Sequence, residues 1–176
     1  MKWKQSKYEG QFLDGQKNGE GTMTYADGSR YTGLWVKDKR QGQGEMTWDT
    51  PEGKASYKGE WSNDLKHGHG RYEWAVGGAY YEGGWVEGKR SGEGVCQYKD
   101  GGVYKGTFAR NVRHGTGSYT FNNDNCSYLG AWENDVKHGK GTFTWEDGTK
   151  FSGMWANGES KAGTLIEPNG TTRKIA

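Results

Sequence analysis

Residues 57–61 read Tyr-Lys-Gly-Glu-Trp, and residues 68–70, which begin eleven positions after Tyr57, read Gly-His-Gly. The same pair of motifs, aromatic-x-Gly-x-aromatic and then Gly-x-Gly, recurs along the chain. The leading aromatic residues are Tyr8, Tyr31, Tyr57, Tyr81, Tyr104, Tyr128 and Phe151. The offset of eleven is kept in six copies, and the seventh has Ala162 in place of the first glycine. Such regularity indicates a tandem array of one structural unit.

Large side chains follow the second glycine of each pair at intervals of two residues. They are Met23 and Tyr25, Met46 and Trp48, Tyr72 and Trp74, Cys96 and Tyr98, Tyr119 and Phe121, and Phe143 and Trp145. The residues between them are mostly polar, and alternation of this kind is typical of a β-strand with one apolar face. Each unit is therefore predicted to contain two strands.

Short connections with turn-forming residues separate the predicted strands. Within units these include Asp14-Gly15, Asn63-Asp64, Asn134-Asp135 and Asn157-Gly158. No connection is long enough for a crossover helix, so neighbouring strands must be antiparallel and in chain order. We therefore predict an all-β fold over residues 1–176: an elongated single-layer antiparallel sheet of seven tandem β-hairpins. About 14 strands at ~4.8 Å each would extend roughly 65 Å, and residues 163–176 are predicted to form a C-terminal cap.

The composition indicates what holds this sheet together. Ile, Leu, Val and Phe number only 19 of 176 residues, whereas there are 25 aromatic residues and 32 glycines. The many rings and the low net charge of +2 argue against disorder. Rings from one strand can lie over bare glycine backbone on the next. Because strands twist strongly, the aromatic face is predicted to curl into a groove.

Charge and cysteine content narrow the class of protein. The net charge of +2 argues against a nucleic-acid-binding protein. Cys96 and Cys126 lack CxxC spacing and are predicted to be free thiols in a reducing compartment. We find neither an apolar run near the start that fits a signal peptide nor a run of ~20 apolar residues that fits a membrane span. The sequence thus predicts a cytoplasmic protein.

The motifs of common enzymes and metal sites are missing from the sequence. His67, His114 and His138 occupy the same repeat position, and copies one unit apart should lie about 10 Å from each other, too far to share one metal ion. The Gly-x-Gly pairs lack the third glycine and the following helix of a phosphate-binding loop. We therefore predict no catalytic activity, no cofactor and no metal.

The seven Tyr-x-Gly-x-Trp-like segments with their Gly-x-Gly partners resemble the MORN (membrane occupation and recognition nexus) repeat over about residues 8 to 167. The resemblance implies a non-catalytic scaffold or adaptor in a cytoskeletal, ciliary or membrane-junction assembly. It also implies that a partner helix or peptide lies in the concave groove.

Two interpretations of the aromatic residues remain open: the rings pack on glycines to hold the sheet, or they also line a binding groove. Under the second, the predicted partner-binding residues are Tyr31, Trp35, Tyr57, Trp61, Tyr81, Trp85, Tyr104, Phe108, Tyr128 and Trp132. A contiguous apolar surface of this kind commonly marks a protein interface. An amphipathic helix or an extended peptide is the predicted ligand.

Two further partners are possible. A basic residue stands two positions before the first glycine in six units: Lys17, Arg40, Lys66, Arg90, Arg113 and Lys137. This basic row would offer weak contact to an anionic phosphoinositide membrane, which is the alternative function. The N-terminal edge strand could also pair with a second copy of the chain.

Overall fold

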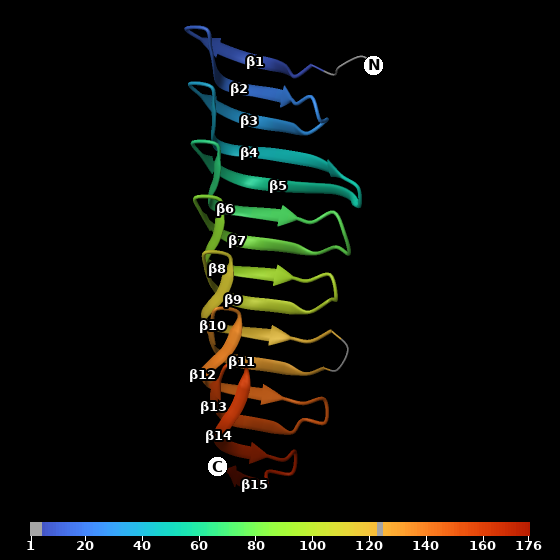
Figure 1. Cartoon of the computed structure of the whole chain (residues 1–176), viewed down its shortest axis with the longest axis vertical. Helices are drawn as coiled ribbons and strands as arrows, with labels where there is room; N and C mark the ends of the chain where they lie inside the picture. The colour runs from blue at the N-terminus through green and yellow to red at the C-terminus, as the bar shows by residue number, and fades with distance from the viewer. Residues whose placement is uncertain (1–4, 123–124) are drawn as a thin grey trace. The chain divides into compact units, whose positions relative to one another are not determined.

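The computed structural model describes residues 5–122 and 125–176, and every regular element in this part of the chain is a β-strand (Figure 1). The fifteen strands are β1 (Lys7–Leu13), β2 (Gln16–Thr24), β3 (Arg30–Val36), β4 (Lys39–Thr50), β5 (Gly53–Ser62), β6 (Leu65–Glu73), β7 (Tyr80–Val86), β8 (Lys89–Gln97), β9 (Val103–Ala109), β10 (Val112–Thr120), β11 (Ser127–Glu133), β12 (Val136–Thr144), β13 (Lys150–Ala156), β14 (Glu159–Ile166) and β15 (Thr172–Ile175). The prediction of an all-β fold is confirmed.

The order of the strands in the sheet is their order in the chain, from β1 to β15. Residues 1–89 and residues 90–176 form two compact units, each described by itself below. Neighbouring strands pair antiparallel within each unit, for example β3 with β4 in the first and β12 with β13 in the second. The predicted succession of antiparallel hairpins is therefore confirmed.

The turns inside the hairpins are two residues long and have positive φ at both positions. Asn63 and Asp64 have φ values of 49° and 69°, and Asn157 and Gly158 have 53° and 84°. Two such residues make a type I′ turn, whose twist matches that of the flanking strands. Asn, Asp and Gly tolerate this left-handed backbone better than other residues. This is why the turn-forming pairs in the sequence located the hairpins correctly.

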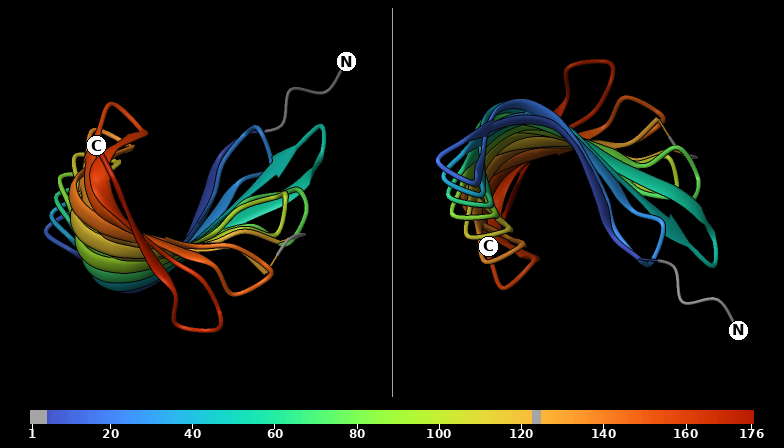
Figure 2. Two further views of the ribbon diagram at one scale, coloured as in Figure 1. Left: turned by 90° about the horizontal axis from the view of Figure 1, so that it is seen from below. Right: turned by 90° about the horizontal axis from the view of Figure 1, so that it is seen from above.

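Hairpins in both units contain an irregularity that bends their strands. In the pair β3–β4 the register shifts between Gly33 and Trp35, and in β11–β12 it shifts between Gly130 and Trp132. A β-bulge of this kind bends the strand and increases its twist. Figure 2 shows the strands of each unit curving strongly along their length, which agrees with the curling predicted from the sequence.

The glycines of the repeat allow rings and backbone to approach each other closely. A Cβ atom built on Gly44 would lie 2.3 Å from the hydroxyl oxygen of Tyr31, and one built on Gly33 would lie 2.5 Å from the Cα of Gly44. Real Cβ atoms do not come this close to other heavy atoms. The prediction that rings lie over glycine backbone is confirmed, and it explains why both motifs require glycine.

The C-terminal segment adds one strand beyond the seventh hairpin. β13 and β14 form that hairpin, in which Gly153 faces Gly163 as the paired glycines face each other in earlier hairpins. β15 then pairs antiparallel with β14. The loss of the first glycine, at Ala162, therefore does not prevent the hairpin from forming.

Candidate functional site

A continuous ladder of edge-to-face aromatic pairs forms the core of each unit. In the first unit, the Tyr31 ring centroid lies 5.1 Å from that of Trp35 in its own repeat and 5.3 Å from that of Trp61 in the next. In the second unit, Tyr128 lies 5.2 Å from both Trp132 and Trp155. Edge-to-face pairs of this type contribute roughly 0.5–1.5 kcal/mol each beyond the burial of their area. The ladder therefore binds consecutive repeats together.

The tyrosine hydroxyls and indole N–H groups of the ladder donate hydrogen bonds to backbone carbonyls. The Tyr31 hydroxyl donates to the carbonyl of Leu34 at 3.1 Å, and the Trp61 Nε1–H donates to the carbonyl of Gly44 at 3.2 Å. Burial raises the pKa of Tyr104 and of Tyr128 to about 12, because the charged phenolate would lose its solvation. The hydroxyl groups and indole N–H groups of these residues are thus hydrogen-bonded within their own chain.

The ten predicted partner-binding residues all belong to this ladder. Tyr31, Trp35, Tyr57, Trp61, Tyr81, Trp85, Tyr104, Phe108, Tyr128 and Trp132 are buried, with exposed fractions from 0% to 6%. The packing interpretation therefore accounts for all ten in the free chain. That they also contact a partner stays a prediction, and the accessible aromatic surface comes from other residues.

A second row of rings, on the later strands of several hairpins and on the residues just after them, is more exposed. In the second unit the row runs through Tyr98, Tyr119, Phe121, Phe143 and Trp145, whose successive centroids lie 5.8, 4.6, 5.8 and 4.9 Å apart. Trp145, which directly follows β12, is 40% exposed. We call these five residues the outer row.

The first unit carries a shorter equivalent of the outer row. Tyr72 lies 5.9 Å from Trp48 and 5.0 Å from Trp74, and Trp74 is 39% exposed. These residues were recognised in the sequence only as the large residues at two and four positions after Gly-x-Gly. The signal that distinguishes them is their place near the end of a hairpin's second strand, beside the connection to the next hairpin.

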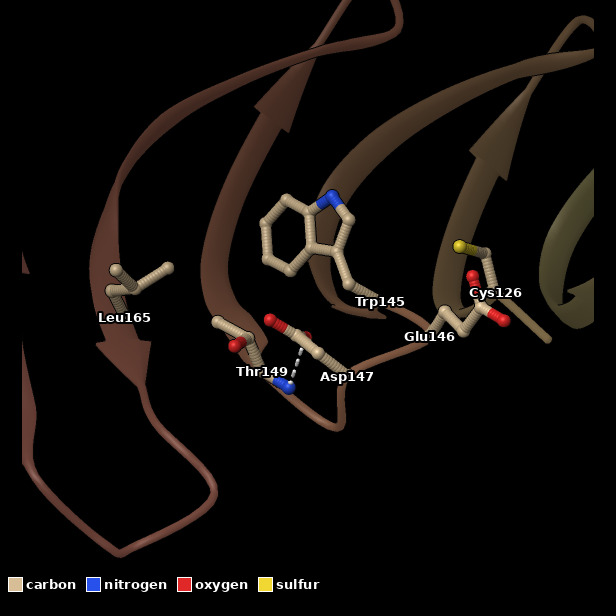
Figure 3. A pocket seen from close by; sticks show the side chains of 6 residues that line it. All are labelled: Cys126, Trp145, Glu146, Asp147, Thr149 and Leu165. Atoms are coloured by element: carbon tan, nitrogen blue, oxygen red, sulfur yellow. Dashed lines mark hydrogen bonds between the residues drawn. The ribbon is translucent and has the colours of Figure 1, made fainter. Parts of the chain in front are cut away.

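An open cleft of about 650 Å³ lies beside the outer row in the second unit (Figure 3). It is lined by Cys126, Trp145, Glu146, Asp147, Thr149 and Leu165. The Trp145 indole stands between Leu165 and Cys126. The Thr149 N–H donates to Asp147 Oδ1 at 2.8 Å, which fixes the acidic loop that lines the cleft. The cleft thus combines an exposed indole with two carboxylates.

The residues of the basic row lie over the aromatic face. The Arg40 guanidinium is 4.3 Å from the Trp61 ring centroid, and that of Arg113 is 4.3 Å from Trp132. Arg113 Nε also donates to Asp135 Oδ1 at 3.0 Å. Cations placed on ring faces contribute about 0.5–2 kcal/mol. Much of the charge of this row is therefore engaged within the protein, although anionic lipid contact stays a prediction.

The remaining predictions concern thiols, metals and membranes. Cys96 and Cys126 are both free, and burial raises the pKa of the Cys96 thiol. Within residues 5–122 and 125–176, no three His, Cys, Asp or Glu side chains are grouped so that they could hold a metal ion. In the same part of the chain, no helix has the length and apolar character that a membrane span requires.

Comparison with known proteins identifies the repeat. No curated protein matches the chain at a significant level. Among solved structures, the SAS-4 (dCPAP) TCP domain in complex with a proline-rich motif of Ana2 (dSTIL), from Drosophila melanogaster, is similar with a TM-score of 0.55. The sequences are 16% identical over 90% of this chain and 84% of the other. The sequence profile of the MORN repeat matches residues 8–30, 31–50, 57–79, 81–103, 104–126 and 128–150. The chain therefore belongs to the MORN-repeat family.

Proposed function

We propose that this protein is a non-catalytic scaffold or adaptor that binds an extended segment of a partner protein along the outer row of aromatic rings. Its MORN repeats and its fold fit a protein-binding scaffold. The finer assignment, to an extended segment on this row, rests on the geometry of the rings. The cytoskeletal or ciliary assembly implied by the resemblance stays a prediction.

The observation that carries this proposal is the exposed end of the outer row in the second unit. The rings of the ladder are buried in the free chain, and their hydroxyl and indole N–H groups are bonded within it. Trp145 instead presents 40% of its surface beside a cleft of about 650 Å³. Interface residues that contribute most to affinity are commonly aromatic side chains beside such a pocket.

An extended, proline-containing segment is the partner that this surface fits best. A row of ring faces is suited to stacking with the rings of a polyproline II segment, which is already extended before it binds. Proline-rich segments lose little conformational entropy on binding, so a shallow surface is sufficient to hold them. The similar TCP domain is in complex with a proline-rich motif, which supports this choice of probe.

The proposal is tested with fluorescent proline-rich peptides titrated against the purified chain. We expect Trp145→Ala to weaken binding by about tenfold, because it removes the exposed indole. Leu129→Ala is the matched control, since Leu129 is an apolar residue that is 61% exposed and lies outside the outer row. Equal losses in both variants, or no loss in either, would contradict a site on the outer row.

The same titration separates the two alternatives. A preference for amphipathic helical peptides over extended ones would favour the helical partner implied by the resemblance. Binding to vesicles of phosphatidylserine, in place of peptides, would favour the membrane function. Such binding should fall steeply with added salt if the basic row carries it.

A further inference from the structure

Lys137 on β12 is a cation held among three aromatic rings. Its Nζ lies 4.2 Å from the centroid of Trp155, 5.1 Å from that of Phe143 and 5.6 Å from that of Tyr128. The side chain is half-buried, and desolvation lowers the pKa of Lys137. Its charge is thus placed on the aromatic face, next to the outer row.

Three other members of the basic row, Lys17, Arg40 and Arg113, lie within ion-pair distance of an Asp in the next repeat. The turn residue Asp135 accepts a hydrogen bond from the backbone N–H of Arg113 at 2.9 Å and forms an ion pair with its guanidinium at 3.0 Å. Asp64 does the same for Arg40, at 3.0 Å in both contacts. A repeat in this arrangement supplies a carboxylate to the basic residue of the repeat before it.

Lys137 lacks this carboxylate. The turn residue that faces it is Gly158, whose N–H donates to the Lys137 carbonyl at 3.0 Å but which has no side chain. In the part of the chain that the structure describes, no Asp or Glu forms an ion pair with Lys137. The nearby Glu159 is paired with Lys161 at 2.9 Å. The Lys137 ammonium is therefore a partly buried charge without a counter-ion.

The outer row connects this charge to the cleft. Lys137 Nζ lies 5.1 Å from the Phe143 centroid, which lies 4.9 Å from that of Trp145, so ammonium and indole are at most about 10 Å apart. An extended peptide spans this distance with about three residues, at ~3.1–3.3 Å each. Glu146 and Asp147, which follow Trp145 in the chain, also line the cleft.

We infer that the partner segment carries an Asp or Glu whose carboxylate pairs with Lys137, about three residues from the proline or apolar residue that packs on Trp145. The segment's remaining positions, over residues 146–147, would then be neutral or basic, because an acid there faces two carboxylates. This inference rests on the proposed function and adds the charge pattern of the bound segment. Pairing is favoured because the Lys137 charge is already desolvated and held in place.

The test uses four variants and one set of probes. The probes are fluorescent proline-rich peptides of about ten residues that carry Glu, Gln or Lys at a single, systematically moved position. Lys137→Met removes the charge and keeps the apolar stem, whereas Lys137→Arg keeps the charge. Gly158→Asp supplies the carboxylate that Asp135 gives to Arg113, and Gly158→Asn is its uncharged control. A Cβ on Gly158 meets no atom within 4 Å, and Asp and Asn occupy this left-handed turn position elsewhere in the chain.

We expect the natural chain to prefer Glu over Gln by about five- to tenfold at one position. Lys137→Met and Gly158→Asp should abolish this preference, while Lys137→Arg and Gly158→Asn should retain it. Circular dichroism checks that each variant is folded. If Gly158→Asp does not fold, the comparison of Lys137→Met with Lys137→Arg decides the result.

The outcomes that would contradict this inference differ from those that would also contradict the proposed function. Peptide binding without a preference for Glu, or a preference that persists in Lys137→Met, would overturn this inference and leave the proposed function standing. Failure of every peptide to bind would overturn both. Lys137-dependent binding to phosphatidylserine vesicles, without a preference for Glu peptides, would assign the cation to a lipid headgroup and also overturn the inference.

Discussion

The indole N–H of Trp132 donates a 3.1 Å hydrogen bond to the carbonyl of Gly117, which belongs to the preceding repeat. Trp35, Trp61, Trp85 and Trp155 make the same bond to the second glycine of the repeat before theirs. Each tryptophan therefore joins two repeats by ring packing and by one hydrogen bond. The stability of such an array depends on contacts between neighbouring repeats.

Trp132→Phe should destabilise the protein by about 1–2 kcal/mol, because it keeps a ring but leaves the buried Gly117 carbonyl without its donor. Trp132→Ala should cost roughly 3–5 kcal/mol, since it also removes the ring from the ladder. Urea denaturation followed by circular dichroism measures both. Equal losses in the two variants would show that the hydrogen bond, and not ring packing, dominates this junction.

The close contact between glycine and tyrosine gives a second prediction. A Cβ on Gly141 would lie 2.2 Å from the hydroxyl oxygen of Tyr128, whose ring is held between two tryptophans. Gly141→Ala should therefore cost at least ~2 kcal/mol through overpacking. Gly158→Asn, at an open turn position, is the control and should change stability by no more than about 0.5 kcal/mol. Similar denaturation midpoints for the two variants would contradict this account of the motif.

Ionisation of the ladder tyrosines should limit stability at high pH. Burial raises the pKa of Tyr104 and Tyr128 to about 12 from the ordinary value of 10.0. Because the folded-state pKa is the higher one, their contribution is fully present below pH 10 and is lost as pH rises through about 12. Tyrosinate absorbance and circular dichroism, recorded together against pH, should change together in this window. Complete ionisation near pH 10 with the fold intact would contradict the burial of these hydroxyls.

The sequence predicted the hairpins well because each is specified locally. Pairs such as Asn63-Asp64 favour a left-handed turn, and alternation after Gly70 marks a strand regardless of what surrounds it. The accessibility of the rings could not be predicted in this way. Tyr57 is covered by Trp85 of the following repeat, so its burial depends on residues far along the chain.

The same reason explains why the site was only partly anticipated. The basic row was visible in the sequence, but whether each cation is neutralised depends on a turn residue of the next repeat. Arg113 meets Asp135, whereas Lys137 meets Gly158, and only the strand register shows which turn faces which cation. Sequence periodicity shows which positions are equivalent in the repeats. Only the structure shows what a differing residue, such as Gly158, leaves without a contact.

The ion pair of Arg113 with Asp135 gives the last prediction. The Asp135 carboxylate accepts from both the backbone N–H and the Nε–H of Arg113, and Arg113 Nη2 donates to the Asp135 carbonyl at 2.7 Å. Asp135→Asn keeps one acceptor oxygen and should cost about 0.5–1 kcal/mol, whereas Asp135→Gly removes every side-chain contact and should cost about 1–2 kcal/mol. Asp135→Gly also reproduces at Arg113 the arrangement found at Lys137. If the missing carboxylate is what creates a preference for acidic peptides, this variant should gain a second such preference while becoming less stable. Peptide titration beside urea denaturation checks both effects, and a less stable variant with no new preference would show that the carboxylate at this turn serves stability alone.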